Sequence, residues 1–248
     1  MEEYSQEDLD ALIQEALSGE DSKLSPKNGL YLGLFETNML ASMYETFSKH
    51  IPNERLVSLF QDVRSDILTS KNNLTLKDLH TVTKNCKKCP LVQSSSELPK
   101  WNSQNPDVLF IADNPRIDKD SADLLVSSMK QAGFDSSKVA LTYVTRCSLP
   151  RKPEPEEITN CSGYLHSEIQ LLNPKIIVPL GLLPLSVLYR SNIQLKQYRG
   201  AVTWLGYWPI LATYSPLYCL RSEGGQTEQF VSDIKTAYNF CYSSIEKI

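Results

Sequence analysis

The sequence has no long apolar run. Although 41% of its 248 residues are apolar, no stretch approaches the roughly 18 to 20 consecutive positions that a membrane span needs, so we expect no membrane partner. The start of the chain also lacks the basic stretch and the apolar stretch of a secretory signal peptide. We therefore expect an intracellular protein, in the cytoplasm or nucleoid, or in the host cytoplasm if a virus encodes it.

An excess of positive charge is also missing, because the formal net charge is −4. This balance argues against a surface that binds polyanions everywhere. It still allows a local basic groove, because much of the acid lies in residues 2–21, which contain no Lys or Arg. No internal repeat or long low-complexity tract is present, and the length suits one large domain with a smaller appendage.

Residues 4–17 are predicted to form a short amphipathic helix. Ser5, with Asp8 three positions later, is a helix-start signal, and leucine and isoleucine then recur at helical spacing. Either this helix packs on the chain's own core, or its apolar stripe lies in the groove of a protein partner.

Changes of pattern along the chain predict three parts. Residues 1–25 form an acidic amphipathic segment, residues 26–73 a small helical region and residues 74–248 the main domain. In the main domain, strand-like runs at 108–112, 139–145, 175–180 and 209–213 alternate with helical patterns. This alternation predicts an α/β fold with three α/β/α layers and a mostly parallel four-stranded sheet, preceded by an N-terminal helical appendage.

Four of the six cysteines have the spacing of a metal site. Cys86 and Cys89 form a C-x-x-C pair, Cys147 follows the second strand-like run, and Cys161 lies near the start of a helical stretch. Only a folded domain can bring such distant residues together, and without an export signal metal ligation is favoured over disulfides. The residues themselves leave a Cys₄ zinc site and an iron–sulfur centre open.

The motifs between and around these cysteines occur in a definite order. They are LKDLHTVTKNCKKCPL, VLFIADNPR, ALTYVTRCSLPRKPEPEEITNC, LLNPKIIVPLG, YRGAV and ATYSPLYCLR. Together they resemble the iron–sulfur branch of the uracil-DNA glycosylase superfamily, the family 4 type, over about residues 76–237. The resemblance implies a [4Fe-4S] cluster held by Cys86, Cys89, Cys147 and Cys161, with Zn as the alternative cofactor.

The resemblance also implies a catalytic set at Asp113, Asn114 and Ser215. Asp113 falls where family 4 has a Glu, and Asn114 falls where related branches carry an Asn that orients water. Ser215 replaces the His that polarises the leaving uracil oxygen, and a neutral hydroxyl stabilises an anion much less than an imidazole does. The usual stretch with a base-stacking Phe is missing between Asp118 and Ser121.

Two further positions depart from the family pattern at the expected base pocket. Arg116 replaces a Gly that leaves the pocket open, so its side chain would either fill the pocket or point outward to a phosphate. Tyr143 replaces an Asn whose amide pairs with uracil, and a phenol cannot reproduce that pairing. We therefore expect an altered uracil pocket.

The DNA-binding side follows the family pattern more closely. Leu220 and Arg221 match the loop that wedges into a duplex while a base leaves the stack. Arg146 and Arg199 belong to basic groups that would contact phosphates without reading the sequence. DNA is thus the expected partner.

These features lead to one functional expectation and two alternatives. The expectation is a DNA-binding iron–sulfur protein with weak or lost uracil excision, acting as an accessory in DNA replication or repair. The first alternative is an active DNA glycosylase that hydrolyses the N-glycosidic bond of uracil or of another damaged base. The second is a cluster-containing assembly protein with no DNA contact. The joint change at Arg116, Tyr143 and Ser215 favours the accessory role.

Overall fold

The structure is a computed structural model of the chain, and it describes residues 75–89, 103, 105–191, 193–205 and 208–242. The expected N-terminal appendage and the helix at 4–17 lie outside these described residues, so both stay predictions. None of the described helices is long and apolar enough to cross a membrane.

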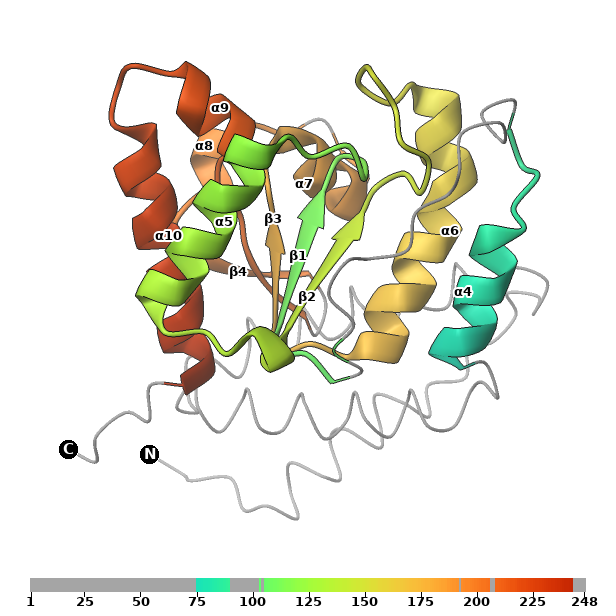
Figure 1. Cartoon of the computed structure of the whole chain (residues 1–248), viewed down its shortest axis with the longest axis horizontal. Helices are drawn as coiled ribbons and strands as arrows, with labels where there is room; N and C mark the ends of the chain where they lie inside the picture. Colours follow the sequence, from blue (N-terminus) through green and yellow to red (C-terminus); the bar gives the residue numbers. More distant parts are fainter. Residues whose placement is uncertain (1–74, 90–102, 104, 192, 206–207, 243–248) are drawn as a thin grey trace, which may run out of the picture.

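A five-stranded sheet lies at the centre, in the order β2-β1-β3-β5-β4 (Figure 1). The strands are β1 (Val108–Ala112), β2 (Val139–Tyr143), β3 (Ile176–Pro179), β4 (Val202–Leu205) and β5 (Trp208–Leu211). All neighbouring pairs are parallel except β4 with β5, which is antiparallel. The expected α/β class is confirmed, whereas the expected number of four strands is wrong. β4 is an edge strand of half-buried residues, so it lacks the fully buried apolar run that marks the central strands.

Helices cover both faces of the sheet, which gives the three expected layers. Those described are α4 (Leu76–Lys84), α5 (Lys119–Ala132), the 3-10 helix η2 (Ser136–Lys138), α6 (Pro155–Leu172), α7 (Leu182–Tyr189), α8 (Leu195–Tyr198), α9 (Pro216–Arg221) and α10 (Gln226–Tyr242). α5, α9 and α10 pack together on one face, and α6 and α7 cover the other (Figure 1). α4 packs on the outer side of α6.

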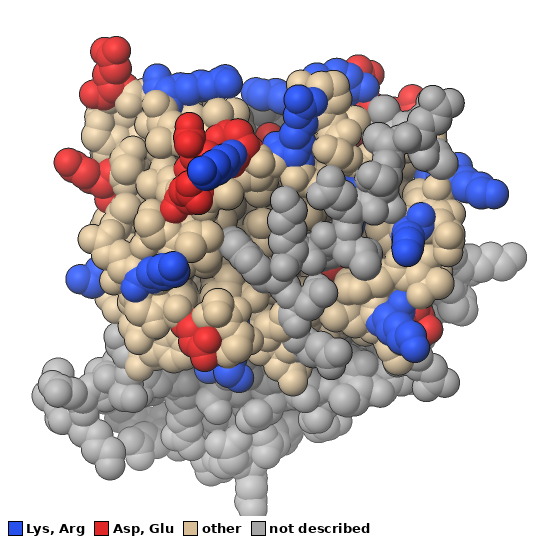
Figure 2. Space-filling model, in the orientation of Figure 1, with Lys and Arg blue, Asp and Glu red and all other residues tan. Residues whose placement is uncertain are grey.

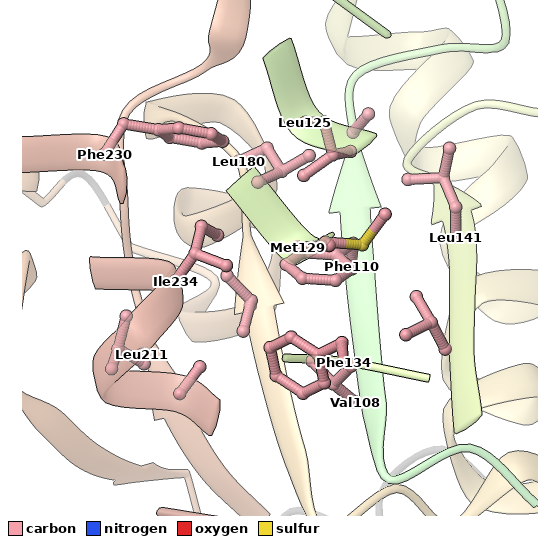
Figure 3. Close-up of a cluster of buried hydrophobic side chains, with 14 of the residues drawn as sticks. Val108, Phe110, Leu125, Met129, Phe134, Leu141, Leu180, Leu211, Phe230 and Ile234 are labelled. Carbon is pink, nitrogen blue, oxygen red and sulfur yellow. The ribbon is translucent and has the colours of Figure 1, made fainter. Parts of the chain in front are cut away.

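Alternate residues of each strand point into two different cores. In β1, Val108 and Phe110 face α5 and α10, whereas Leu109 and Ile111 face α6 and α7. Figure 3 shows the first core, in which Phe134 fills the space beside Phe110. Because both of its faces are buried, the central strand β1 is apolar throughout.

Local signals place the two helices that carry the expected cysteine ligands. Thr75 and Asp78 form a reciprocal capping box at the start of α4. Cys86 follows Asn85, the C-cap residue of α4, and its N–H donates to the Thr83 carbonyl at 3.1 Å. α6 begins with Pro155 at its first turn, so Cys161 lies in its second turn.

Candidate functional site at the carboxyl edge of the sheet

The carboxyl ends of the parallel strands form the edge at which most of the expected site residues lie. β2 pairs with one side of β1 and β3 pairs with the other side, so the strand order reverses beside β1. In open α/β sheets a ligand binds at such a switch point, outside the carboxyl ends of the strands. Backbone hydrogen bonds from Val144 to Ala112 (2.9 Å) and from Thr145 to Asp113 (3.1 Å) continue the pairing into this edge.

The segment after β1 carries Asp113, Asn114 and Arg116. Burial raises the pKa of the half-buried Asp113 carboxyl, and the charge of Lys152 opposes this shift. The Asn114 side-chain oxygen accepts the backbone N–H of Arg116 at 2.9 Å, which fixes the turn. The Arg116 side chain is exposed, and its expected contact with a phosphate stays a prediction.

Ser215 lies after β5 and begins α9. Its hydroxyl accepts the backbone N–H of Tyr218 at 3.2 Å, so this side chain acts as the helix cap. A Cβ atom at Gly181 would come within 3.3 Å of the Ser215 Cβ, and Gly181 also has a φ of +108°. The close approach of the segments after β3 and β5 therefore depends on a glycine.

Tyr143 is the last residue of β2 and has a relative exposure of 0%. It is among the largest fully buried side chains and packs in the first core with Ala112 and Leu180. Its ring is therefore closed off from solvent in this conformation. A DNA base could reach the position of the expected pairing Asn only if the core opened.

Arg146 is buried, which counts against the expected phosphate contact. Its guanidinium forms an ion pair with Glu168 at 2.6 Å and donates to the Thr142 hydroxyl at 2.7 Å. Thr142 in turn donates to Glu168, and His80 of α4 lies 3.4 Å from the same carboxylate. The network therefore joins α4, α6 and the segment after β2, which are the three elements that carry the expected cysteine ligands.

Arg199 is likewise engaged within the protein. Its Nη1 lies 2.9 Å from both oxygens of Asp233 on α10, and Asp233 also accepts the Thr213 hydroxyl at 2.7 Å. Burial raises the pKa of Asp233, while Thr213 and Arg199 oppose the shift. The Arg199 guanidinium also lies 5.0 Å from the ring centre of Tyr214. This charge is thus mostly satisfied before any phosphate approaches.

Leu220 and Arg221, in contrast, are exposed on α9. Lys and Arg side chains gather along the edge toward which the strand arrows of Figure 1 point (Figure 2). Exposed basic residues in the segments of this edge are Arg116, Lys119, Arg151, Lys152 and Arg221. A local basic edge therefore exists in spite of the negative net charge.

The four expected cysteine ligands come from three elements. Cys147 and Cys161 are buried, Cys86 and Cys89 are half-buried, and all four are free thiols. Burial raises the pKa of Cys161, Arg146 opposes this shift, and the neighbouring Cys86 and Cys89 add to it, so these three cysteines lie within electrostatic reach of one another. In the part of the chain that the structure describes, however, no three His, Cys, Asp or Glu side chains are gathered as a site for a metal ion.

Two observations test whether this region suits an iron–sulfur cluster. Its donors are thiols alone, the ligands that such clusters take. Among the described residues the buried Nε of Arg146 has no hydrogen-bond partner, and the Arg146 charge acts on Cys161. A buried cation with a spare N–H donor suits a group that carries negative charge and sulfur acceptors. The residues present therefore fit the cluster chemically.

Comparison with known proteins decides the family. Residues 99–237 match the family model described as the Uracil DNA glycosylase superfamily. The chain belongs to this superfamily. Within it, the chain is 27% identical over 172 residues to the type-4 uracil-DNA glycosylase of Thermotoga maritima, which covers 63% of this chain and 90% of that protein.

Other type-4 uracil-DNA glycosylases show the same relationship. The protein of Pyrobaculum aerophilum is 27% identical over 169 residues, or 60% of this chain and 86% of that protein. The protein of Archaeoglobus fulgidus is 24% identical over 187 residues, or 67% of this chain and 94% of that protein. The resemblance to the type-4 branch of the uracil-DNA glycosylase superfamily is thereby confirmed.

Two buried acids of this superfamily member, Glu168 and Asp233, were not predicted from the sequence. Both lie on the apolar stripe of a helix: Glu168 between Leu165 and Leu172, and Asp233 beside Phe230. A carboxylate at a core-facing position needs a partner, because an unpaired buried charge is very unfavourable. An acidic residue at a core-facing helix position is therefore the sequence signal for a buried ion pair. It does not tell which arginine is the partner.

Proposed function

We propose that this member of the uracil-DNA glycosylase superfamily is a DNA-binding iron–sulfur protein with weak or lost uracil excision, which assists DNA replication or repair inside a cell. The observation that carries the proposal is the complete burial of Tyr143. A glycosylase must hold a flipped base in a pocket and read its Watson–Crick edge. Here the position expected to supply the pairing amide is filled by a phenol in the protein core.

The state of Ser215 supports the same proposal. Its hydroxyl already accepts a backbone N–H as the cap of α9, and it carries no charge that could stabilise a leaving uracil anion. In other enzymes, removing one such stabilising donor lowers the rate on the order of 10²- to 10³-fold. The altered pocket weakens uracil binding and the altered donor weakens stabilisation of the uracil anion, so we expect little uracil excision.

Binding to DNA has its own structural support. The exposed basic residues of the sheet edge suit phosphates, whose contacts are electrostatic and independent of sequence. Leu220, which is 46% exposed on α9, is an apolar side chain that could enter a base step. Arg116 and Arg221 flank this edge and are the best candidates for phosphate contacts.

The proposed cofactor is a [4Fe-4S] cluster held by Cys86, Cys89, Cys147 and Cys161. When bound, such a cluster supplies a redox-active centre and a covalent link between distant segments. The protein's own contribution is the network of Glu168 with Arg146, which joins the three elements that bear the cysteines. Iron and sulfide in near-stoichiometric amounts would support the cluster, whereas stoichiometric zinc without iron would refute it.

One observation favours the alternative of an active DNA glycosylase. Asp113 lies at the carboxyl edge of the sheet, and burial raises its pKa. Perturbed carboxyls at such edges are often catalytic, and a basic carboxylate there could activate a water. This alternative needs a base pocket formed by residues other than Tyr143.

The deciding experiment measures abasic-site formation on uracil-containing single- and double-stranded DNA, together with DNA binding at low salt. The Thermotoga maritima enzyme serves as the positive control, and Asp113→Asn as the matched variant. We expect binding without turnover. Turnover that Asp113→Asn abolishes would establish the alternative instead, and a failure to bind either DNA would contradict both.

A protein partner for the segment 4–17 is a separate proposal, based on the apolar stripe in its sequence. A pull-down with a peptide of residues 1–25 tests it. The control peptide replaces Leu9, Leu12 and Ile13 by serine at unchanged net charge. Capture of the same proteins by both peptides would refute the recruitment role.

A further inference from the structure

Asp233, Arg199, Tyr214 and Tyr218 contact one another in this order, from the buried Asp233 to the surface beside Ser215. Asp233 holds the Arg199 guanidinium at 2.9 Å, and that guanidinium lies 5.0 Å from the ring centre of Tyr214. The Tyr214 ring is 5.2 Å from the Tyr218 ring, with an angle of 39° between their planes. Each member is therefore supported by the one beneath it.

The stack ends in an aromatic ring that is open to solvent. Tyr218 is 49% exposed, although large aromatic rings usually contribute to stability by burial. Its backbone is fixed, because its N–H is capped by the Ser215 hydroxyl. The exposed side chains of Leu217 and Leu220 lie on the same short helix. The ring is thus held in place before any ligand arrives.

The charges around Tyr218 indicate what kind of ligand would cover it. Hydrogen bonds from Ser121 lower the pKa of Asp118, and Arg221 lowers it further, so Arg221 lies near the segment that carries Arg116. Both arginines are exposed, and neither forms an ion pair with another residue in the part of the chain that the structure describes. An exposed aromatic ring on the same edge as exposed cations matches the alternation of bases and phosphates in a nucleic acid strand more closely than it matches the apolar groove of a protein partner.

We propose that Tyr218 is a stacking platform for an unpaired DNA base, supported by Tyr214 and Arg199. A base inside a duplex is covered on both faces by its neighbours, so only a single strand or a splayed base can use the platform. The inference rests on the proposed DNA binding and makes it more specific. It predicts a preference for single-stranded or gapped DNA over intact duplex.

The test compares the affinities of the wild type, Tyr218→Ala and Tyr218→Phe for a labelled oligo-dT and for a hairpin duplex, by fluorescence anisotropy. Val82→Ala, at an exposed apolar position on α4, is the control for general surface effects. We expect Tyr218→Ala to bind oligo-dT about tenfold more weakly, which corresponds to about 1.4 kcal/mol of stacking. Tyr218→Phe keeps the ring and should bind as the wild type does.

The salt dependence separates stacking from charge. Loss of a stacking contact lowers the affinity equally at every salt concentration, whereas loss of a phosphate contact changes the slope against salt. Equal binding of oligo-dT by Tyr218→Ala and wild type would overturn the platform, and so would equal weakening on oligo-dT and duplex. If the wild type binds neither DNA, the proposed function itself fails. Binding to both with no effect at Tyr218 refutes only the platform.

Discussion

Replacement of Glu168 by Gln should destabilise the protein strongly, because Glu168 belongs to the most buried ion pair among the described residues. Glu168 has a side-chain exposure of 1%, and its partner Arg146 has 4%. Gln has nearly the same shape but no charge, so the substitution leaves the Arg146 guanidinium buried without its counter-ion. It also weakens the acceptor for Thr142 and His80.

The expected magnitude follows from the burial of the pair. Breaking a buried ion pair by removing one partner typically lowers the free energy of unfolding by about 3–5 kcal/mol. For a domain of this size, each 1 kcal/mol shifts the melting temperature by about 2–4 °C. We therefore expect Glu168→Gln to melt roughly 10 °C below the wild type. Because the network joins the cysteine-bearing elements, we also expect less bound iron per chain.

Circular dichroism melting and iron analysis of both proteins measure the two effects. The matched control is Glu157→Gln, because Glu157 pairs with Arg151 at the same 2.6 Å distance but with a partner that is 44% exposed. Such an exposed pair contributes about 1 kcal/mol or less. Equal melting temperatures for the wild type and Glu168→Gln would refute the reasoning, as would equal losses in the two variants.

The pH dependence gives a second check on the same pair. Burial raises the pKa of Glu168, but the Arg146 charge and the hydrogen bonds from His80, Thr142 and Arg146 lower it more, so the net shift is downward from 4.5. A depressed pKa in the folded state gives stability that is present above 4.5 and is lost as the pH falls below it. The difference in stability between wild type and Glu168→Gln should therefore shrink in acid. A difference that grows below pH 4.5 would contradict this sign.

Three other predictions concern the sheet edge and the cysteines. Gly181→Ala should lower the free energy of unfolding by about 1–3 kcal/mol, because its φ is +108° and the new Cβ would come within 3.3 Å of the Ser215 Cβ. An unchanged denaturation midpoint would show that the loop relaxes freely. Arg221→Gln should reduce the slope of log affinity against log salt by about 1, and an unchanged slope would remove Arg221 from the phosphate contacts. Cys161→Ser should abolish the absorbance at roughly 400 nm expected of the cluster; wild-type absorbance in this variant would show that Cys161 is not a ligand.

Much of the fold was predictable because the strands are buried on both faces. Runs such as the one at 108–112 are apolar throughout, and they identified β1, β2, β3 and β5 to within about two residues. β4 was not predictable in this way. Its residues are half-buried at the sheet edge, where it pairs with β5 alone, so it has no long apolar run.

The candidate site was only partly predictable. Sequence analysis could name Arg146 and Arg199 as cations, but it could not tell that each is neutralised within the fold. Their partners lie 22 and 34 residues away, on helices whose facing is set by tertiary packing. The role of Ser215 as a helix cap and the stacking of Tyr214 on Tyr218 likewise depend on the turn after β5.

The position of α10 has a consequence for the order of events during synthesis. This helix supplies Phe230, Ile234 and Ala237 to the first core, and all three are fully buried. The ribosome makes β1 more than a hundred residues earlier, so the part of this sheet face that α5 and α9 do not cover stays exposed until α10 has been made. Exposed apolar surface on a nascent chain promotes aggregation. The domain should therefore complete its folding only after residue 242 has left the ribosome, and until then it is a natural client for chaperones.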